Sequence, residues 1–493
     1  MITNLKPYPA YKDSDVEWLG QVPEHWEIRR LGSSVRGCVN GVWGSEPNGK
    51  DDLPCVRVAD FDRSRLRVHL DKPTMRAISS SDRVRRLLEP GDLLLEKSGG
   101  GDLQPVGRVV LYDHPTVAVT SNFIARMPVE NGYDSIYLTY LHAALYSIEL
   151  NVRSIKQTTG IQNLDSRTYL SELVAFPPLP EQTAIVRFLD YMDRRIRRYV
   201  RAKQKLIKLL EEYKQALIHQ AVTGSIDVRT GKPYPAYKDS GVEWLGEVPE
   251  HWELKPLKRW VRINASVLPD TTPADYEFRY IDIGTVGTGF LTREPQQLRF
   301  SNAPSRARRV LHMGDTLVST VRTYLKAVYY VDGDAEALVC STGFAVLTPG
   351  PGTQPKYVSY LVQSNTFTDR VTAESVGTAY PAIAEGRLGS FYVPFPPLPE
   401  QTAIVEYLDT QTTKIDAAIS AARREIELLR EYRTRLIADV VTGKVDVREV
   451  AARLPEEPPE EEAESIDTDE IAEDEATDEE AGTETVEEEE VEP

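Results

Sequence analysis

Ser98 begins a run of small residues that is a first candidate for phosphate chemistry. Ser98-Gly-Gly-Gly101 has the glycines that let backbone amides surround a phosphate group. No Lys-Ser or Lys-Thr pair follows this run, and no G-x-x-x-x-G-K-[ST] motif occurs in the 493 residues. In the second half of the chain, Thr320-Val-Arg-Thr-Tyr324 occupies the corresponding place. The sequence therefore favours a strand-to-loop turn over a nucleotide-binding loop.

The tetrapeptide Phe-Pro-Pro-Leu occurs twice, at 176–179 and 395–398. It looks similar to the Asn/Asp-Pro-Pro-Tyr loop of adenine methyltransferases, in which an Asn or Asp oxygen accepts the adenine amino group. Phenylalanine replaces that residue in both copies, and no glycine-rich nucleotide fingerprint accompanies them. No acidic pair followed by Glu-x-Lys indicates a nuclease. We assign no catalytic residue, and the pattern favours a binding protein over an enzyme.

Metal-ligand and membrane signals are also missing from the sequence. The three cysteines, Cys38, Cys55 and Cys340, lie far apart, and the seven histidines form no H-x-x-x-H pair. We therefore expect no metal site and no disulfide framework, with a reducing cytoplasm as the location. No run of 18 apolar residues occurs, and the first 30 residues do not form a signal peptide.

The net charge of −18 is concentrated at the C-terminal end of the chain. Residues 456–493 contain 21 Asp and Glu and no Lys or Arg, which leaves residues 1–455 with a net charge of +3. With few apolar residues, segment 449–493 is expected to be a disordered acidic tail. It is interpreted as a solubilising tail or, alternatively, as a DNA mimic that covers a basic surface. The rest of the chain has no negative field that would repel nucleic acid.

Two long helices are predicted over 176–224 and 395–448. Each copy has proline (Pro180, Pro399) where a first helical turn tolerates it, and glycine (Gly224, Gly443) where a helix stops. Their apolar residues follow alternating steps of four and three, the pattern of a coiled-coil seam. The predicted seam comprises Ile185, Leu189, Met192, Ile196, Tyr199, Leu206, Leu210, Tyr213 and Leu217, interrupted by Lys203, and then Ile404, Leu408, Ile415, Leu429, Tyr432 and Leu436. The apolar residues of the two helices follow the same spacing, whereas their polar faces differ. We therefore expect the helices to pair with each other through the apolar residues.

An irregular arm precedes each half of the chain, at 1–31 and 225–257. Residues 7–31 and 233–257 are identical at 20 of 25 positions. The arms contain Trp18, Trp26, Trp244 and Trp252, which we interpret as packing anchors and not as an aromatic cage for a ligand. Because Gly224 leads directly into the second arm, each arm is expected to pack on the end of a long helix.

The segments between arm and helix, 32–175 and 258–394, share only a faint pattern. Short β-rich runs precede one amphipathic helix in each, near 134–150 and 355–371. The predicted fold class is α+β (mixed α/β), with two globular domains separated by a pair of long antiparallel coiled-coil helices. The order arm, domain, helix, repeated twice, predicts a pseudo-two-fold internal repeat.

This duplicated frame resembles the specificity subunit of type I restriction-modification systems. The resemblance is carried by the two Pro-Pro-Leu-Pro-Glu-Gln helix starts (177–182 and 396–401) and by the Trp-Leu-Gly-x-Val-Pro-x-His-Trp arms (18–26 and 244–252). The turn Gly91-Asp-Leu-Leu94 is also similar, and the resemblance covers nearly all of residues 7–448. It implies a non-catalytic subunit with two target-recognition domains, 32–175 and 258–394. Each would recognise one half of a split DNA site, so the site would be asymmetric and bipartite.

The resemblance also implies partners and cofactors that this chain does not bind itself. Two methyltransferase subunits would dock on the long helices and bring S-adenosylmethionine to methylate adenine at N6. Restriction subunits that use ATP and magnesium would join later. The helices would set the distance between the domains, since groove-reading modules on one face of a duplex are spaced by turns of about 34 Å. Two alternatives are a structural coiled-coil adaptor and a self-contained DNA-modifying enzyme.

Exposed loops with cationic, amide and hydroxyl side chains are the candidates for DNA contact, because such groups bind phosphates and base edges. In the first domain these are Lys97, Ser98, Gln157, Thr158, Thr159 and Asn163; in the second they are Arg322, Thr323, Tyr324, Lys326, Thr378 and Tyr380. The candidates for partner contact are Arg194, Arg195, Arg198, Glu181, Gln182, Glu400 and Gln401. The arginines are alternatively interpreted as phosphate contacts or as a solvated helix face.

Overall fold

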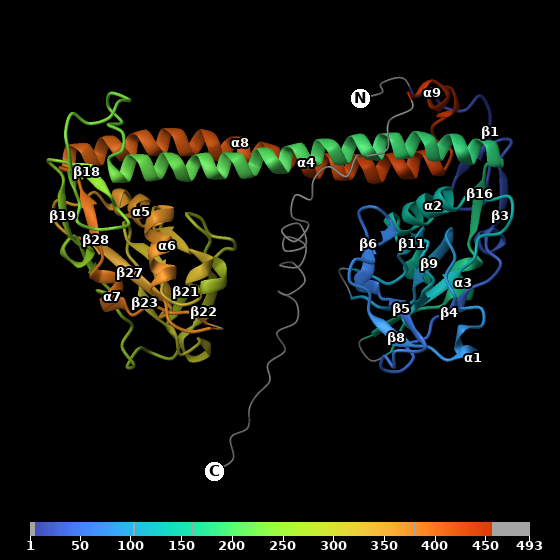
Figure 1. Ribbon diagram of the computed structural model, residues 1–493, viewed down its shortest axis with the longest axis horizontal. Helices are drawn as coiled ribbons and strands as arrows, with labels where there is room; N and C mark the ends of the chain where they lie inside the picture. Colours follow the sequence, from blue (N-terminus) through green and yellow to red (C-terminus); the bar gives the residue numbers. More distant parts are fainter. Residues whose placement is uncertain (1–4, 102–103, 159–160, 379, 456–493) are drawn as a thin grey trace, which may run out of the picture. The chain divides into compact units, whose positions relative to one another are not determined.

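The computed structural model describes residues 5–101, 104–158, 161–378 and 380–455. The predictions for Thr159 and for most of the acidic tail lie outside these residues. The chain divides into two compact units, Met1–Tyr199 with Leu428–Pro493, and Val200–Glu427. Each unit thus contains one arm, one globular domain and parts of both long helices (Figure 1).

Unit 1 is built around a six-stranded sheet in the order β4-β13-β9-β11-β7-β6. Its strands are β4 (Val39–Asn40), β6 (Phe61–Asp62), β7 (Arg67–Val68), β9 (Asp92–Glu96), β11 (Val109–Tyr112) and β13 (Ile124–Met127). All neighbours are antiparallel except β7 and β11. Every residue of β9 is buried, which accounts for its apolar run Leu93–Leu95. Helix α2 (Ser135–Ser147) packs on β9 and β11.

Two three-stranded sheets complete the first globular domain, in the orders β12-β5-β8 and β10-β15-β14. Their strands are β5 (Asp52–Val56), β8 (Met75–Ala77), β10 (Ser98–Gly99), β12 (Val119–Thr120), β14 (Ile155–Thr158) and β15 (Ile161–Leu164). The short helices are α1 (Ser80–Arg83) and α3 (Ser166–Leu170). Strands β12 and β13 belong to different sheets because the chain turns between them, where the amide of Ile124 donates to the carbonyl of Ser121.

Unit 2 contains two four-stranded sheets, in the orders β20-β27-β24-β25 and β22-β21-β26-β23. Their strands are β20 (Val261–Ile263), β21 (Glu277–Ile281), β22 (Gln296–Arg299), β23 (Ala307–Val310), β24 (Thr316–Ser319), β25 (Val328–Tyr330), β26 (Leu338–Ser341) and β27 (Phe344–Pro349). The helices are α5 (Pro355–Gln363), α6 (Asn365–Ala373) and α7 (Glu385–Gly389). The single helix predicted near 355–371 is broken at Ser364, whose extended backbone (φ −60°, ψ 139°) ends α5 and precedes α6.

The two arms fold alike. Each forms a hairpin and then adds a strand to the segment that enters the long helix. The strands are β1 (Tyr11–Asp13), β2 (Gln21–Pro23), β3 (Glu27–Arg30) with β16 (Leu173–Phe176), then β17 (Tyr237–Asp239), β18 (Glu247–Pro249), β19 (Glu253–Pro256) with β28 (Tyr392–Phe395). Trp26 and Trp252 are completely buried, as expected of packing anchors.

Each arm also covers the end of a long helix, as the sequence predicts. A Cβ atom on Gly443 would lie 2.4 Å from the Pro23 ring, and one on Gly224 would lie 2.4 Å from the Pro249 ring. Both glycines have left-handed backbones (φ +77° and +75°), so a larger residue would be strained as well as crowded. The first arm therefore packs on the C-terminal end of the second helix, within unit 1.

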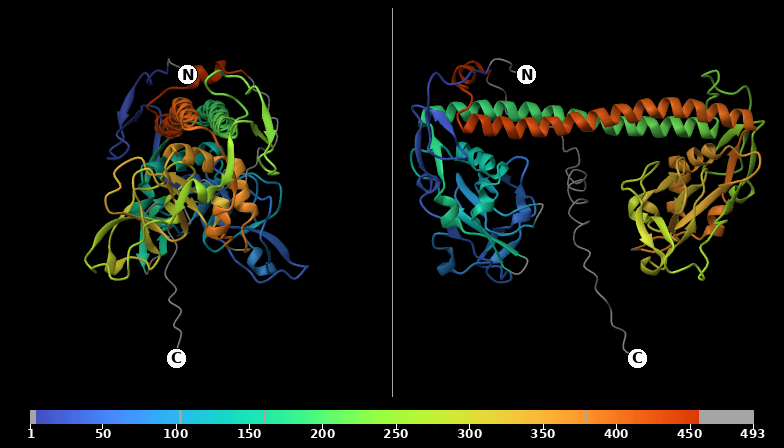
Figure 2. Two further views of the ribbon diagram at one scale, coloured as in Figure 1. Left: turned by 90° about the vertical axis from the view of Figure 1, so that its left-hand side faces the viewer. Right: turned by 180° about the vertical axis from the view of Figure 1, so that it is seen from behind.

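The long helices are α4 (Leu179–Thr223) and α8 (Leu398–Val441), and a short helix α9 (Arg448–Arg453) follows. Both helices begin beside the predicted prolines and end just before Gly224 and Gly443, so α8 stops at Val441 and not at the predicted residue 448. Helix α9 also corrects the start of the predicted disordered tail, because residues 449–453 are helical. In unit 2, Lys203 pairs with Glu425 and Lys214 with Asp416, so positions rise along α4 as they fall along α8. The helices are thus antiparallel in this unit, and they lie side by side in both views of Figure 2. Within the described residues, no helix has the length and apolar character that crossing a bilayer requires.

The seam on α4 differs from the predicted one along its middle. Tyr199, Leu206 and Tyr213 are 53%, 41% and 54% exposed, so they do not face α8. Leu210 of the predicted seam packs on the apolar cluster that contains residues of α8, and so does Ile207, which the predicted seam does not include. The ion pairs of Lys203 and Lys214 with α8 hold this flank of α4 against its partner. The predicted spacing fails there because Lys214, which is outside the predicted seam, faces α8 together with Lys203, the one predicted interruption. The long stem of a lysine can lie along an apolar seam.

Candidate nucleic-acid interface

Residues of the first globular domain that were predicted from two separate loops meet at one sheet edge. Strand β10 pairs with β15 so that Ser98 lies opposite Asn163, and the Ser98 hydroxyl donates to the Asn163 Oδ1 atom at 2.6 Å. The Lys97 ammonium donates to the Asn40 Oδ1 atom at 2.7 Å, close to the surface. Hydrogen bonding between the Leu164 amide and the Lys97 carbonyl (2.8 Å) fixes this junction.

The remaining first-domain candidates lie on the neighbouring hairpin. Gln157 and Thr158 end strand β14, opposite Gln162 and Ile161 of β15. Ile161 is 52% exposed, whereas the Gln162 side chain turns inward and accepts a hydrogen bond from the Val106 amide at 3.2 Å. The hairpin therefore extends the sheet edge that carries Ser98, and DNA contact by its residues stays a prediction.

In the second domain the candidates form one cluster, in which Tyr324, Thr378 and Tyr380 are exposed. Arg322 and Lys326 both have left-handed backbones (φ +50° and +49°) that bracket a single helical turn, and Tyr324 on this turn is 53% exposed. The Arg322 guanidinium lies over the ring of Tyr380, 5.0 Å from its centroid. The Lys326 ammonium pairs with Asp369 at 2.6 Å. A cation stacked on an exposed tyrosine presents the groups that bind phosphates and stack on bases.

Thr323 and Thr378 differ within this cluster. Thr378 is exposed, but Thr323 is only 2% exposed and its hydroxyl donates to the Ser375 Oγ atom at 2.8 Å. The structure thus corrects the prediction of DNA contact by Thr323, which instead holds the turn onto the segment after α6. The sequence predicts an exposed Thr323 hydroxyl because it does not show that Ser375 lies close enough to bind it.

The two domains bring their predicted loops together in the same way. Ser98 pairs with Asn163 in the first domain, and Val321 forms an antiparallel bridge with Ala382 in the second. The loop pairs are equivalent in topology, yet their exposed side chains differ: lysine, serine and asparagine in one, arginine and tyrosine in the other. The arrangement can therefore present two different sets of hydrogen-bonding and stacking groups on one scaffold.

Glu181 and Glu400 are not available for partner contact, because each is bound inside its own unit. Glu181 is 6% exposed, and its carboxylate accepts hydrogen bonds from Tyr8 Oη (2.6 Å) and Trp26 Nε1 (2.9 Å). His25 Nε2 lies 2.7 Å from the same carboxylate. Burial, together with the adjacent Glu181, raises the pKa of Tyr8, so its hydroxyl stays protonated and donates.

Glu400 repeats this network in unit 2. Tyr234 Oη (3.2 Å) and Trp252 Nε1 (3.0 Å) donate to its carboxylate, and His251 Nε2 lies at 2.9 Å. One sequence pattern could have predicted these networks. Each copy of the arm, with its Tyr-x-x-Tyr and His-Trp motifs, is accompanied by one copy of the Pro-Glu-Gln helix start. The sequence shows both repeats, but it does not show that they lie together in space.

Gln182 and Gln401 are also used internally. The amide of Asp134 donates to the Gln182 Oε1 atom at 2.9 Å, and the amide of Gln354 donates to the Gln401 Oε1 atom at 2.8 Å. Asp134 and Gln354 are the N-cap residues of α2 and α5. The glutamines therefore attach the globular domain to the long helix, and the structure corrects the prediction that they contact a partner.

The three arginines predicted for partner contact, Arg194, Arg195 and Arg198, lie on α4 and differ in exposure. Arg198 is exposed, whereas Arg194 and Arg195 are partly buried. The Arg195 guanidinium donates to the Tyr191 hydroxyl at 3.1 Å, and hydrogen bonds to Tyr199 and Tyr191 raise the pKa of Arg195. A cationic surface is thus present on this helix, and its ligand stays a prediction.

Comparison with known proteins agrees with this duplicated frame. Residues 302–428 match the family model of the type I restriction modification DNA specificity domain. The type I restriction enzyme MjaVIII specificity subunit of Methanocaldococcus jannaschii is 23% identical over 440 residues, which cover 87% of this chain and 95% of that protein. Over most of its length the chain is therefore similar to specificity subunits of type I restriction-modification systems.

Two further comparisons support this subunit's fold. The EcoDI specificity subunit of Escherichia coli is 24% identical over 303 residues, or 55% of this chain and 65% of that protein. A structure solved for the assembly and conformational transition of a type I system superposes with a TM-score of 0.62 at 17% identity, over 85% of this chain and 98% of that one. The predicted fold of two α+β domains joined by long helices is therefore confirmed.

Proposed function

We propose that this specificity subunit binds an asymmetric bipartite DNA site, with one half-site bound by each globular domain. The observation that carries the proposal is the pair of equivalent loop clusters with different side chains, around Ser98–Asn163 and around Arg322–Tyr380. Two scaffolds of one topology are suited to dock on duplex DNA in the same manner. Their different side chains would then select different sequences.

The catalysis of a type I system lies in other subunits, and the specificity subunit is not itself an enzyme. We propose that methyltransferase subunits bind S-adenosylmethionine and methylate adenine at N6 in the site that this chain selects. Restriction subunits would contribute ATP hydrolysis and magnesium. Because such a complex acts on the host's own DNA, we place the chain in the cytoplasm.

The repeated frame supports docking of two identical methyltransferase subunits, one for each arm and helix end. An exposed apolar flank on α4 supports the choice of the helices as docking surface: Leu206, Leu209 and Tyr213 are 41%, 52% and 54% exposed. These residues follow helical spacing and do not face α8. Large apolar side chains in a row on a helix are typical of a protein interface.

Mapping of methylated adenines in host cells tests the proposal. Cells with this gene and its methyltransferase partner should carry methylation at one bipartite sequence, which disappears when this gene is deleted. Replacement of residues 32–175 by the equivalent segment of a related subunit should change one half of that sequence and leave the other half unchanged. A change in both halves, or methylation without this gene, would contradict the proposal.

A further inference from the structure

Three arginines of α4 share one face of the helix within unit 1, and this arginine face consists of Arg187, Arg194 and Arg198. They are seven and four residues apart, steps that return to nearly the same side of a helix. Arg187 and Arg198 are exposed, and Arg194 is partly buried. The Arg198 side chain forms no ion pair among the described residues, so its charge is available to a ligand.

The acidic residues in this part of α4 are bound by the arm, the globular domain and α8. Glu181 is held by the first arm, as described above. Asp190 accepts a hydrogen bond from the Tyr140 hydroxyl at 2.6 Å. Asp193 is 6% exposed and pairs with Arg433 of α8. These carboxylates therefore serve the interior of unit 1, and the surface of this helix segment is cationic.

Helix α8 does not repeat the arginine face, although it repeats the frame around it. Glu181 and Glu400 bind the two arms in the same way, which fixes the correspondence between the helices. In the places of the three arginines, α8 has Glu406, Thr413 and Ala417. A ligand that docked equally on both helices would need similar charges on both. The arginine face therefore suits a ligand that is present once for each chain.

An acidic segment of the chain itself begins beside this face. Residues 456–493 contain 21 Asp and Glu and no Lys or Arg, and they follow soon after α9. Helix α9 is held on unit 1 by Ala451, which is 1% exposed, and by Leu454, which packs on the apolar cluster of this unit. The Arg187 Nη2 atom donates to the Leu454 carbonyl at 2.7 Å, and α9 lies near the beginning of α4 (Figure 1). The described part of the chain therefore ends at the arginine face.

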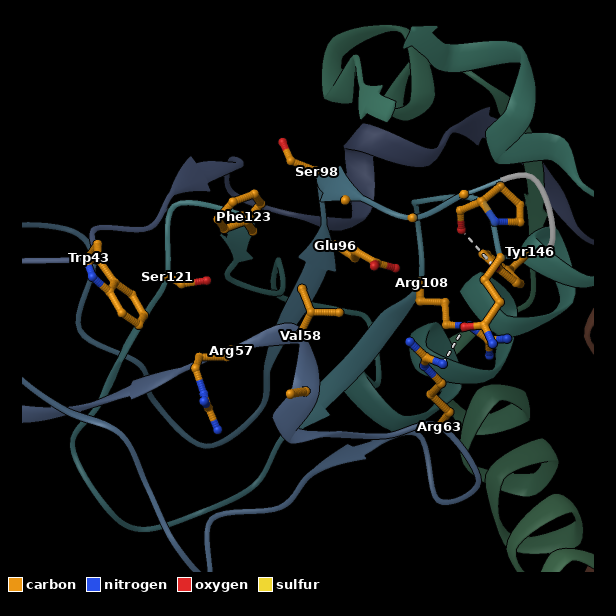
Figure 3. Close-up of a pocket in the computed structure, with 16 residues that line it drawn as sticks. Trp43, Arg57, Val58, Arg63, Glu96, Ser98, Arg108, Ser121, Phe123 and Tyr146 are labelled. Carbon is orange, nitrogen blue, oxygen red and sulfur yellow. Dashed lines mark hydrogen bonds between the residues drawn. The ribbon is translucent and has the colours of Figure 1, made fainter. Parts of the chain in front are cut away.

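Other cationic groups of unit 1 are engaged within the globular domain. A cavity beside β10 is lined by Arg57, Arg63 and Arg108 (Figure 3). Arg57 pairs with Asp60 at 3.0 Å, and the Arg108 guanidinium lies 4.4 Å from the Tyr146 ring. Both groups thus have partners in their own domain. The arginine face of α4, which is close to the start of the acidic segment, is the better binding surface for it.

The acidic segment is long enough to contact the whole arginine face. Arg198 lies eleven positions after Arg187, which is about 16 Å along a helix. Residues 456–462 span about 23 Å when extended, and five of these seven residues are glutamate. Because the segment is covalently joined to α9, its first glutamates have a local concentration of roughly millimolar at this face.

We propose that the acidic segment 456–493 docks on the arginine face of α4, with the glutamates of 456–462 against Arg194 and Arg198. Single exposed ion pairs contribute little and are screened by salt, so the docking depends on several glutamates and on the covalent connection. In this position the segment covers cations that would otherwise bind the phosphates of any DNA. It thereby reduces the binding of unrelated DNA, whichever sequence the globular domains recognise.

Carbodiimide cross-linking of the full chain tests the docking, because this reagent joins a carboxylate to an amine that it contacts. Arg198→Lys keeps the charge and supplies the amine. Cross-linked peptides should connect position 198 with residues 456–462 at low salt and disappear at about 1 M salt, where charges are screened beyond about 3 Å. Ala417→Lys is the matched control at the exposed equivalent place on α8, and its cross-linking to this segment should be about tenfold weaker.

Equal yields at the two positions, or no cross-link at position 198, would overturn the proposal. A mixture of isotopically labelled and unlabelled chains shows which chain supplies the acidic segment. The cross-linked peptides should carry one isotope only. Peptides that combine both isotopes would assign the arginine face to the acidic segment of a second copy, and would overturn docking within one chain.

Binding of an unrelated DNA duplex at low salt measures the consequence of docking. Replacement of the five glutamates in 456–462 by glutamine should strengthen this binding about tenfold, because the arginine face becomes accessible to phosphates. Addition of Arg187→Glu and Arg198→Glu should reverse the gain. The matched control replaces the five glutamates in 487–492, which changes the net charge equally and should leave binding unchanged. Equal strengthening by both sets, or none by the first, would show that the segment does not cover this face.

Discussion

At the scale of residues, one buried carboxylate holds each arm onto the start of a long helix. Glu181 accepts from Tyr8 and Trp26, whose own polar atoms are buried and have no water to replace the bond. Hydrogen bonds to a charged group contribute about 1.5–3 kcal/mol each, and a buried donor left unpaired costs about 1–3 kcal/mol. Glu181 also lies in the first turn of α4, where the helix dipole favours negative charge.

Glu181→Ala should therefore destabilise unit 1 by about 3 kcal/mol, because two buried donors lose their acceptor. Urea unfolding of the full chain, followed by tryptophan fluorescence, measures the loss. Glu400→Ala should produce a similar loss in unit 2, since its network has the same donors. Exposed Glu406 on α8 provides the control, and a loss as large in Glu406→Ala would contradict this account.

A second residue-scale prediction concerns acid stability. His142 is fully buried on α2, its Nδ1 atom lies 2.8 Å from the Tyr169 hydroxyl, and burial lowers the pKa of His142 to about 3. Between pH 6.5 and 3 the unfolded chain binds a proton here and the folded chain does not. Above pH 6.5 His142 therefore does not lower the free energy of unfolding. Below pH 6.5 it lowers that free energy by about 1.4 kcal/mol per pH unit.

His142→Gln removes that titration while retaining a group that can accept from Tyr169. The free energy of unfolding at pH 7 minus that at pH 5 should be about 2 kcal/mol smaller in the variant than in the native chain. Carboxylates contribute equally to both proteins, so they cancel in the comparison. Identical pH dependence in the two chains would show that folding does not lower the pKa of His142.

At the scale of elements, α4 has one flank that packs on α8 and an adjacent flank that is exposed. Leu210 packs on the apolar cluster of unit 2 that contains Ile415 and Ile419, while neighbouring Leu209 is 52% exposed. Two leucines one position apart thus have different environments. This difference separates helix pairing from partner docking in an experiment.

Leu210→Lys should destabilise unit 2 by about 2 kcal/mol, because a charged group replaces apolar contact with α8. Leu209→Lys should change stability by less than about 0.5 kcal/mol. In the assembled complex, however, Leu209→Lys should weaken methyltransferase binding if the exposed flank is the docking surface. Thermal unfolding of the isolated chain and co-purification with the methyltransferase measure the two effects. Equal destabilisation by both variants would contradict the assignment of the flanks.

At the scale of the whole molecule, each compact unit combines segments from distant parts of the chain. Unit 1 needs residues 428–455 to return to the first arm, where Arg448 approaches Glu181 and Gly443 packs on Pro23. Unit 2 uses the end of α4 in the equivalent role. Both long helices pass without a break from one unit into the other, so their length is a property that neither domain controls.

Insertion of four residues into both helices, after Val200 in α4 and after Leu428 in α8, tests whether helix length sets the DNA spacing. Four residues add about 6 Å, or nearly two base-pair steps of about 3.4 Å, and keep the seam close to phase. The methylated sequence should keep both halves and gain one or two unspecified base pairs between them. Sequencing of modified adenines in cells that carry the variant gives the result.

The insertion in α4 alone is the matched control. The two insertion points lie between the row that joins Asp193 to Arg433 and the row that joins Lys203 to Glu425. A single insertion shifts α4 relative to α8, so that both ion pairs cannot form at the same time. Site-specific methylation should therefore be lost. An unchanged spacer with full activity in the double insertion would show that the helices do not measure the DNA.

The frame of this protein can be predicted from its sequence, because local rules act on repeated segments. Proline at a first turn, glycine at a helix end and apolar residues in steps of three and four predict α4 and α8 within a few residues. Because the frame is duplicated, each of these patterns occurs twice and supports the prediction of the other copy. The same repetition predicts a partner surface at Glu181 and Gln182, and there the prediction is wrong because both side chains are buried.

Which polar groups face inward depends on the packing of segments that are far apart in the sequence. Glu181, Thr323 and Glu96 each lie in segments whose pattern permits exposure, and each is buried by residues far away in the chain. The flank of α4 that faces α8 was likewise set by Lys203 and Lys214 pairing with acidic residues about 200 positions later. A hydrogen bond or ion pair depends on the position of both partners, and sequence spacing constrains that position only within one element.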